Sequence, residues 1–354
     1  MIDTAASQTA SKGSLSGRSL AGFGDVYRDG IERVLCRGAT VEAVRDTLSV
    51  ASNFGTASRR TRELLSHVLS VSDTTSSLIW SEERPINIPF CFGLVAWTLS
   101  GSNDLEEIAY YNPRGRDFSD DGKSLWGAFG HRIFDGVPSQ IGTAVELLRS
   151  DNASRRAVAV ALSRTDSAIQ TRDFPCLLAI QFVIRDGALH ALTFMRSQSA
   201  LMVLPYDAFL FMAIQGFVSA SLGLPAGTFT HISGSFHIYE DELALARRVV
   251  ASRIVDVGVS PFPLDTQSAL PEVLTREARV RQAVIARDAR CVAQVADEVG
   301  DRCCSTFLDE MLCVLLVEAA RRLGMTTVAV KQLDRLAPSL RRAMEFYLET
   351  TYGS

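Results

Sequence analysis

Helically spaced apolar residues and continuous apolar runs are separated by polar turns in the first two thirds of the chain. Apolar residues at intervals of three and four are typical of a helix with one buried face, and a run that is apolar throughout indicates a helix buried on all sides. The predicted helices are Val26–Leu35, Asn87–Leu99, Ile141–Arg149 and Tyr206–Leu222. The most apolar window, Ala200–Val218, contains Pro205 and Asp207, which favours a buried core helix over a membrane span.

Between residues 155 and 240 the apolar pattern changes to that of β-strands. The predicted strands occupy Arg155–Arg164, Pro175–Ser197 and Phe229–Glu240. Within the second segment, Asp186 and Gly187 separate two apolar runs, which is typical of a tight hairpin. Residues 38–82 show no clear period, and residues 110–123 are polar with Pro and Gly, so we expect a loop over 110–123.

Beyond about residue 268 the chain is rich in Ala, Arg, Glu and Leu, with helical spacing and little strand signal. Three helices are predicted there, over Leu270–Gly300, Thr306–Leu323 and Leu333–Tyr352. The whole pattern predicts an α+β fold, in which a mixed or mostly antiparallel sheet is backed by long buried helices. We expect a flexible tail over residues 1–24, a main domain over 25–267 and an all-helical C-terminal appendage over 268–354.

The composition narrows the class of protein. The chain has 354 residues, of which 47% are apolar and 21% charged, so a large core can form and general disorder is excluded. A net charge of −4 offers no electrostatic footprint for duplex nucleic acid or an anionic membrane. The first twenty residues lack the apolar core of a signal peptide, and the seven cysteines form no CxxC. We therefore expect reduced thiols, a cytoplasmic location and no metal site.

A few polar residues stand out as candidates for chemistry. They are Cys176, the pairs Arg155-Arg156 and Arg196-Ser197, and His237 with Tyr239. Taken alone, each has an ordinary structural explanation: a lone cysteine among apolar residues is more often a buried thiol, and an arginine pair is often a solvated strand end. His237 and Tyr239 are two residues apart and share a strand face, as either a core pair or two hydroxyl-binding groups.

Eight short motifs between residues 99 and 240 follow one another in a recognisable order. They are LSGSND (99–104), DFSDDG (117–122), WGAFGHRI (126–133), SRRAV (154–158), DFPC (173–176), QFVIRDGALHALTFMRS (181–197), LPYDAF (204–209) and SGSFHIYE (233–240). The ordered set resembles the thymidylate synthase and pyrimidine-nucleotide hydroxymethylase family. The resemblance covers roughly residues 85–245, and more loosely 30–265, and leaves out the tail and the helical appendage.

The resemblance implies a role for each candidate residue. Cys176 matches the nucleophile that adds to carbon 6 of a pyrimidine nucleoside monophosphate, a step for which a thiolate is suited. Arg196 and Ser197 match residues that hold the 5′-phosphate, and nearby arginines would favour the thiolate. The family further implies a homodimer in which a second arginine pair reaches the same phosphate across the interface, and a ribose contact by two side chains. These correspond to Arg155 with Arg156, and to His237 with Tyr239.

Asp207 distinguishes this sequence from relatives that act on uracil, which usually carry Asn at this position of the LPYD motif. Cytosine presents an amine and an unprotonated ring nitrogen. A carboxyl group can accept from the amine and, when protonated, donate to the ring nitrogen. The residue therefore favours a cytosine nucleotide, CMP or dCMP, although LPYD also fits some uracil-type relatives.

The positions that serve folate and proton transfer in the family depart from its pattern. Leu94 stands at the position of the catalytic Glu, Phe129 replaces a Tyr, Ser199 replaces the Asp that contacts the pterin, and Val203 replaces a Gly. The residue after the cysteine, often His or Thr, is Leu177. Use of 5,10-methylenetetrahydrofolate is thus in question, unless a displaced acid such as Asp120 or Asp121 compensates. The family's C-terminal segment closes over the site, and here the chain runs on for about ninety residues, so closure must differ.

Three functions remain open. The first is a folate-dependent 5-hydroxymethylase of a cytosine nucleotide, of the kind found in phage DNA modification and nucleoside antibiotic biosynthesis. The second is a folate-independent enzyme that uses the same cysteine adduct for deamination, hydrogen exchange or loss of a substituent. The third is a non-catalytic nucleotide-binding subunit that docks through its helical appendage. The motifs do not distinguish ribose from deoxyribose.

Overall fold

The computed structural model describes residues 22–43, 59–300 and 302–353, so the predicted tail over 1–24 lies almost entirely outside the described residues. The centre of the fold is a six-stranded sheet in the order β1-β2-β7-β6-β5-β4. Strands β6 and β7 are parallel, and the other neighbours are antiparallel. The strands are β1 (Ala39–Ala43), β2 (Arg59–Val71), β4 (Val158–Val160), β5 (Leu177–Arg185), β6 (Ala188–Ser199) and β7 (Ala226–Tyr239), and β3 (Leu78–Ser81) pairs with β8 (Ile254–Val257) in a second sheet.

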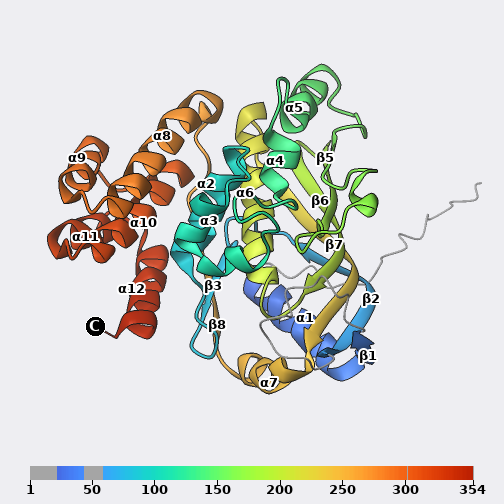
Figure 1. Cartoon of the computed structure of the whole chain (residues 1–354). Coiled ribbons are helices and arrows are strands. Elements are labelled where there is room, and N and C mark those ends of the chain that lie inside the picture. The colour runs from blue at the N-terminus through green and yellow to red at the C-terminus, as the bar shows by residue number, and fades with distance from the viewer. Residues whose placement is uncertain (1–21, 44–58, 301, 354) are drawn as a thin grey trace, which may run out of the picture.

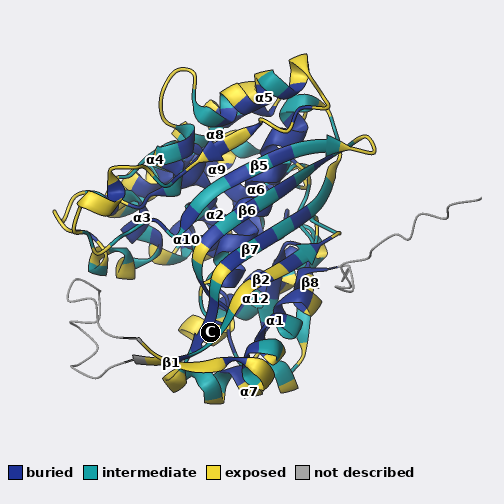
Figure 2. Ribbon diagram, turned by 90° about the vertical axis from the view of Figure 1, so that its right-hand side faces the viewer, coloured by how far each residue is buried: buried dark blue, intermediate teal, exposed yellow. Residues whose placement is uncertain are grey.

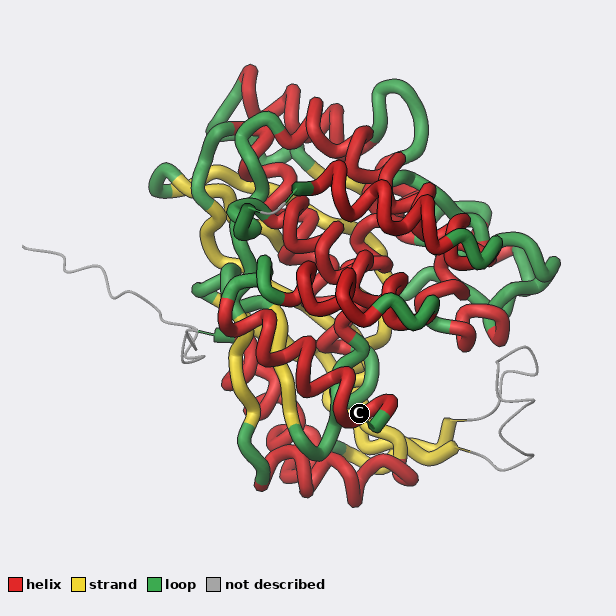
Figure 3. Tube along the Cα trace, turned by 90° about the vertical axis from the view of Figure 1, so that its left-hand side faces the viewer, coloured by secondary structure: helices red, strands yellow, loops and turns green. Residues whose placement is uncertain are grey.

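The helices gather on one side of the main sheet. Figure 1 shows α6 along the strands and the last helices beyond it, and Figure 3 shows the same layer from the helical side. In Figure 2 strands β5, β6 and β7 face the viewer, and no described helix crosses in front of them. The helices are α1 (Phe23–Arg37), α2 (Ile88–Leu99), α3 (Leu105–Tyr111), α4 (Phe129–Phe134), α5 (Gln140–Ser150), α6 (Leu204–Leu222), α7 (Leu243–Ala251), α8 (Thr266–Ile285), α9 (Ala289–Val299), α10 (Phe307–Arg322), α11 (Thr326–Leu333) and α12 (Pro338–Tyr352).

Several predicted elements are confirmed, as is the α+β class. The β5–β6 hairpin turns at Asp186 and Gly187, both with positive φ (51° and 76°), which suits the twist of the two strands. Helix α6 is buried along nearly its whole length and ends at Gly223 in the left-handed conformation. Helix α2 is also almost wholly buried, and the side chain of Asn87 caps it by accepting the backbone N–H of Phe90 at 3.0 Å.

Other predictions differ from the structure. The segment over 38–82, which has no clear period, contains β1, β2 and β3. The strand predicted over Arg155–Arg164 is regular only at Val158–Val160. Residues 110–123 are not one loop, because they include the end of α3 and a 3₁₀ helix at Pro113–Asp117. After that helix, Asp121 accepts the backbone N–H groups of Lys123 and Ser124, both at 2.8 Å, and holds a tight turn.

The C-terminal region contains five described helices where three were predicted. The long helix predicted over Leu270–Gly300 is interrupted at Arg287, which has a φ of +56°, and Asp288 caps the next helix, α9. The helix predicted over Leu333–Tyr352 begins only at Pro338, since proline favours the first position of a helix. The short helix α11 (Thr326–Leu333) was not predicted, because it lies between two predicted helices. The prediction missed the break at Arg287 because apolar spacing continues across it.

These C-terminal helices share a core with the sheet and its helices. The ring of Phe307, at the start of α10, stacks on Phe262 at 4.3 Å and lies 5.4 Å from Phe92 of α2. A buried polar link accompanies this aromatic contact, because the hydroxyl of Tyr111 donates to Glu277 of α8 at 2.7 Å. Removing a large buried ring such as Phe307 typically costs about 3–5 kcal/mol of stability. Among the described residues, no helix combines the length and the apolarity needed to cross a membrane.

Candidate functional site

Cys176 lies immediately before β5, in a segment that is held by Arg196 of β6. The guanidinium of Arg196 donates to the carbonyl of Pro175 at 2.9 Å and to that of Phe174 at 3.0 Å, and it lies 5.1 Å from the centre of the Phe174 ring. The backbone N–H of Arg196 also donates to the carbonyl of Cys176 at 2.9 Å. The arginine thus fixes the path of the chain on both sides of the thiol.

Neighbouring groups shift the pKa of the Cys176 thiol in opposite directions. Burial raises its pKa above that of an ordinary cysteine, the positive charge of Arg196 lowers it, and the carboxyl groups of Asp207 and Asp173 raise it. Burial is the largest of these effects, so the thiol is mostly protonated at neutral pH in the absence of a ligand. The sequence led us to expect that arginine would favour the thiolate, and here a single arginine does not outweigh burial.

Asp207 is a buried carboxyl group in the first turn of α6. Its one hydrogen-bond partner among the described residues is the side chain of Gln198, whose Nε2 donates to Oδ2 at 3.0 Å. Burial raises the pKa of Asp207 to about 7, and the hydrogen bond from Gln198 acts in the opposite direction. The carboxyl group therefore changes its protonation state near neutral pH, so it can act as an acceptor or as a donor.

The polar residues of β6 and β7 lie at corresponding positions of the two strands. Ser197 pairs with Ser235, and Ser199 pairs with His237. The rings of His237 and Tyr239 meet edge to face at 5.1 Å. Burial lowers the pKa of His237, as does Arg196, while Glu63 of the neighbouring strand β2 raises it. Cys176, Arg196, Asp207 and His237 thus interact electrostatically in one region of the molecule.

Arg155 and Arg156 are not part of this cluster within one chain. Both side chains are exposed, and they precede the edge strand β4. The register pairs Val160 with Ala179 and Val158 with Gln181, so the two arginines lie toward the far end of β5 from Cys176. Seven residues of strand separate the two places, which corresponds to about 20 Å. One chain alone does not bring the pair to the thiol.

The positions that the resemblance assigns to folate and proton transfer carry side chains of other chemistry. Leu94, on α2, packs against the apolar core, and Phe129 stacks on Phe211 of α6 at 5.9 Å. The hydroxyl of Ser199 accepts the backbone N–H of Met202 at 3.3 Å, and Val203 is 43% exposed. None of these four groups is an acid, so the proton transfer and the pterin contact that the resemblance assigns to these positions would have to come from other residues. Leu177 is fully buried in the core.

Asp120 and Asp121 were suggested as replacements for the catalytic Glu of the family. The carboxylate of Asp121 is used in hydrogen bonds that hold its own turn. Hydrogen bonds from Ser124 and Lys123 hold its pKa well below the ordinary range, which makes it a poor proton donor. Asp120 accepts the backbone N–H of Arg172 at 3.0 Å. Asp173 is a more relevant carboxyl group, because it accepts the backbone N–H of Gly127 at 2.7 Å and raises the pKa of Cys176. Burial raises the pKa of Asp173 itself.

Sequence reasoning missed three residues near the thiol. Asp173 stands in the DFPC motif and Gln198 follows Arg196-Ser197, so proximity to a recognised motif is the signal that could have found them. Glu63 belongs to a segment without a clear period, and only the register of β2 against β7 places it opposite His237.

With this geometry established, the comparisons with known proteins identify the class. The family model for thymidylate synthase matches residues 25–257, which is more than half of the chain. The chain therefore belongs to the thymidylate synthase family.

Individual relatives are similar over parts of their length. The chain is 31% identical over 172 residues to the deoxyuridylate hydroxymethyltransferase of Pseudomonas phage M6, covering 47% of this chain and 48% of that protein. It is 27% identical over 202 residues to the protein of the same name from Bacillus phage SP01, covering 52% of each. The chain thus spans about half the length of these relatives. Thermostable thymidylate synthase A from Bacillus subtilis shares the fold, with a TM-score of 0.57 at 15% identity over 67% of this chain and 86% of that one.

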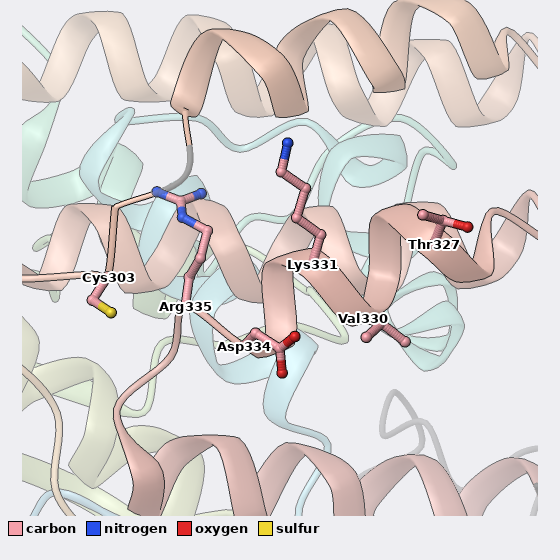
Figure 4. Close-up of a pocket in the computed structure, with 6 residues that line it drawn as sticks. All are labelled: Cys303, Thr327, Val330, Lys331, Asp334 and Arg335. Atoms are coloured by element: carbon pink, nitrogen blue, oxygen red, sulfur yellow. The ribbon is translucent and has the colours of Figure 1, made fainter.

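A separate hollow of about 430 Å³ lies on the C-terminal helices, outside the segment that the family model matches. Figure 4 shows its lining residues, Cys303, Thr327, Val330, Lys331, Asp334 and Arg335. The side chain of Arg335 is held there by donating to the carbonyl of Arg302 at 2.7 Å. None of the predicted site residues lines this hollow.

The influence of Arg196 on the thiol can be measured by alkylation. Because Arg196 lowers the pKa of Cys176, we expect Arg196→Leu to raise that pKa further and to move the pH profile of iodoacetamide labelling to higher pH. Peptide mapping by mass spectrometry would follow Cys176 separately from the other six cysteines. Arg185→Leu, which removes an exposed arginine at the other end of β5, serves as the control. An unchanged profile in Arg196→Leu would contradict the electrostatic role.

Proposed function

We propose that the protein is a cytosine-nucleotide 5-hydroxymethylase acting on CMP or dCMP, with a folate-borne one-carbon unit expected from the family. The observation that carries this proposal is that Cys176 is close enough to the cation of Arg196 and to the carboxyl group of Asp207 for both to act on its pKa. The hydroxymethyltransferases of the two phages act, by their names, on deoxyuridylate, whereas we expect Asp207 to favour the cytosine ring in this chain. Free thiols at all seven cysteines accord with the cytoplasmic location that we propose.

The nucleotide chemistry follows from the chain's own residues. The phosphate would bind Arg196 and Ser197, and the base would face Asp207. The sulfur of Cys176 would form a bond to carbon 6, the electrons of the 5,6 double bond would move to carbon 5, and carbon 5 would become the nucleophile. Carbon 5 would form a bond to the one-carbon unit as the carrier of that unit leaves, and water would supply the hydroxyl group. Loss of the proton on carbon 5 and elimination of the thiolate would restore the double bond.

Asp207 supplies a physical basis for choosing cytosine. A neutral carboxyl group can donate to the unprotonated ring nitrogen and accept from the exocyclic amine, whereas uracil offers a donor and an acceptor in reversed order. A pKa of about 7 keeps a large fraction of Asp207 neutral at physiological pH. The hydrogen bond from Gln198 to Oδ2 leaves Oδ1 as the oxygen on which the proton is better placed.

A folate-independent reaction is the second candidate, and the apolar character of Leu94 and Phe129 favours it. The same addition of Cys176 saturates the 5,6 bond, which by itself permits hydrogen exchange at carbon 5 or deamination of cytosine. For deamination, water would add at carbon 4 and ammonia would leave, and elimination of the thiolate would then restore the 5,6 double bond.

We also propose that the protein is a homodimer through the helix-free face of the sheet. One row of mutually paired positions on this face is apolar from the edge strand β4 to β2, and it consists of Val160, Ala179, Phe194, Ile232 and Val68. At its two ends Val160 is 48% and Val68 53% exposed. An apolar sheet face of this size is suited to association with a second copy. In such a dimer, Arg155 and Arg156 would reach the nucleotide phosphate in the site of the partner subunit.

The change in mass of the nucleotide after incubation with the protein tests the proposed function. We expect CMP or dCMP to gain one CH₂O unit when methylenetetrahydrofolate is supplied, and Cys176→Ala to abolish the gain while nucleotide affinity stays within about tenfold, because affinity rests mainly on phosphate contacts. Tritium release from carbon 5 without folate would instead support the second candidate. Binding without either reaction would leave a nucleotide-binding subunit and overturn the proposed enzyme.

Changing Asp207 to Asn should shift preference from cytosine toward uracil nucleotides, at a cost of about 2–4 kcal/mol for the original ring. In the unchanged protein, the ratio of CMP affinity to UMP affinity should fall as pH rises through about 7, because the neutral carboxyl group is lost. Calorimetry over that pH range measures the two affinities. The titration of the phosphate affects CMP and UMP equally, so it cancels in their ratio. A ratio that is independent of pH and of the substitution would mean that Asp207 does not face the base.

Replacing an inner residue of the apolar row should break the dimer. We expect Ile232→Glu to yield a monomer in light scattering and to weaken nucleotide binding, since it would separate Arg155 and Arg156 from the opposing site. Leu264→Glu, at an apolar position that is 79% exposed outside the sheet, should stay dimeric. A monomeric unchanged protein would refute the proposed assembly.

A further inference from the structure

A row of polar side chains crosses three adjacent strands beside the predicted nucleotide site. In the parallel pair β6–β7, Ser199 lies opposite His237, and in the antiparallel pair β2–β7, His237 lies opposite Glu63. Residues directly opposite one another in a sheet present their side chains on the same face. Glu63 and His237 are therefore neighbours on one face, although they are 174 positions apart in the sequence.

Glu63 has contacts that hold its carboxylate close to His237. The hydroxyl of Ser235, two residues before His237 on β7, donates to Oε1 of Glu63. The carboxylate also raises the pKa of His237, as expected for a negative charge close to the ring. Glu63 is only partly buried, and its partner Ser235 is a neutral hydroxyl, so the carboxylate keeps further lone pairs for a ligand.

The chemistry of the neighbouring groups indicates what the carboxylate binds. A nucleotide sugar carries hydroxyl groups, which are donors, and an ionised carboxylate is the strongest acceptor that a side chain offers them. The phosphate would lie at Arg196 on β6. Glu63 is on β2, two strand spacings to the side, and its row passes through Ser199, three residues further along β6, so the two backbone positions are about 14 Å apart. This separation keeps two negative groups apart, and one nucleotide together with the long arginine and glutamate side chains can span it.

We propose that Glu63 accepts a hydrogen bond from a sugar hydroxyl of the bound nucleotide, beside His237. This assignment rests on the proposed function, because it takes the nucleotide to lie along β6 and β7. It adds a specificity residue on a third strand, and it gives the protein a means of recognising the sugar that does not involve the base. The hydroxyl concerned is the 2′ or the 3′ group, and the two are separable by ligand analogues.

The test is a thermodynamic cycle of binding affinities, in which one residue of the protein and one hydroxyl group of the ligand are changed separately and together. Calorimetric affinities are measured for CMP, dCMP and 3′-deoxy-CMP, with the unchanged protein and with Glu63→Gln. We expect Glu63→Gln to weaken CMP binding by about tenfold or more, as for a hydrogen bond to a charged group. We expect little or no loss for the one analogue that lacks the contacted hydroxyl. The same loss for all three ligands, or none, would overturn the assignment.

A control variant separates this contact from a change in folding. Glu42→Gln removes an exposed carboxylate on β1 that pairs with Arg60, and should have no effect. Circular dichroism checks that Glu63→Gln is folded. If the unchanged protein binds none of the three nucleotides, the proposed function and this assignment both fail; if it binds them and the cycle shows no coupling, only the assignment fails.

Discussion

The candidate site depends on the hydrogen bonds that Arg196 donates to the segment before β5. Its side chain donates to the carbonyl oxygens of Phe174 and Pro175, and its backbone N–H donates to that of Cys176, so one residue of β6 sets the position of the thiol. The guanidinium has five N–H donors, and two are used in this way. The remaining donors and the positive charge can therefore serve a phosphate without releasing the cysteine.

Burial and charge act against each other at the same place. The thiol and the carboxyl group of Asp207 are both buried, and burial raises the pKa of each, so both tend to be neutral before a ligand binds. A neutral carboxyl group is the form suited to cytosine, whereas the thiol must ionise to react. In the proposed dimer, the arginine pair 155–156 of the partner subunit would add positive charge near the phosphate site and would thereby favour ionisation of the thiol. Assembly and chemistry would then be linked through the pKa of Cys176.

The parts of the fold that the sequence could predict are those whose cause is local. Helix α6 and the β5–β6 hairpin depend on an apolar run and on Asp186-Gly187, and both are where they were expected. Strand β2 was missed because charged residues occupy both of its faces near Arg62 and Glu63. The cysteine and its arginine were found through ordered motifs, but Gln198 and Glu63 act through partners that only tertiary contacts bring near. The spacing of residues along the chain does not show how two strands pair, so it could not predict which residues lie opposite each other.

The C-terminal helices pack against α2, the helix that carries Leu94. Phe92 of α2 meets Phe209 of α6 and Phe307 of α10, and these two rings also lie 5.9 Å from each other. Leu94 packs against this apolar core and against the cluster that contains Trp97 and Leu105, so an uncompensated charge at position 94 would be costly. Leucine instead adds to the core that joins the helices to the sheet. The apolar substitution and the added helices thus support one arrangement, in which α2 is a structural element and the polar chemistry is concentrated on β6, β7 and the start of α6.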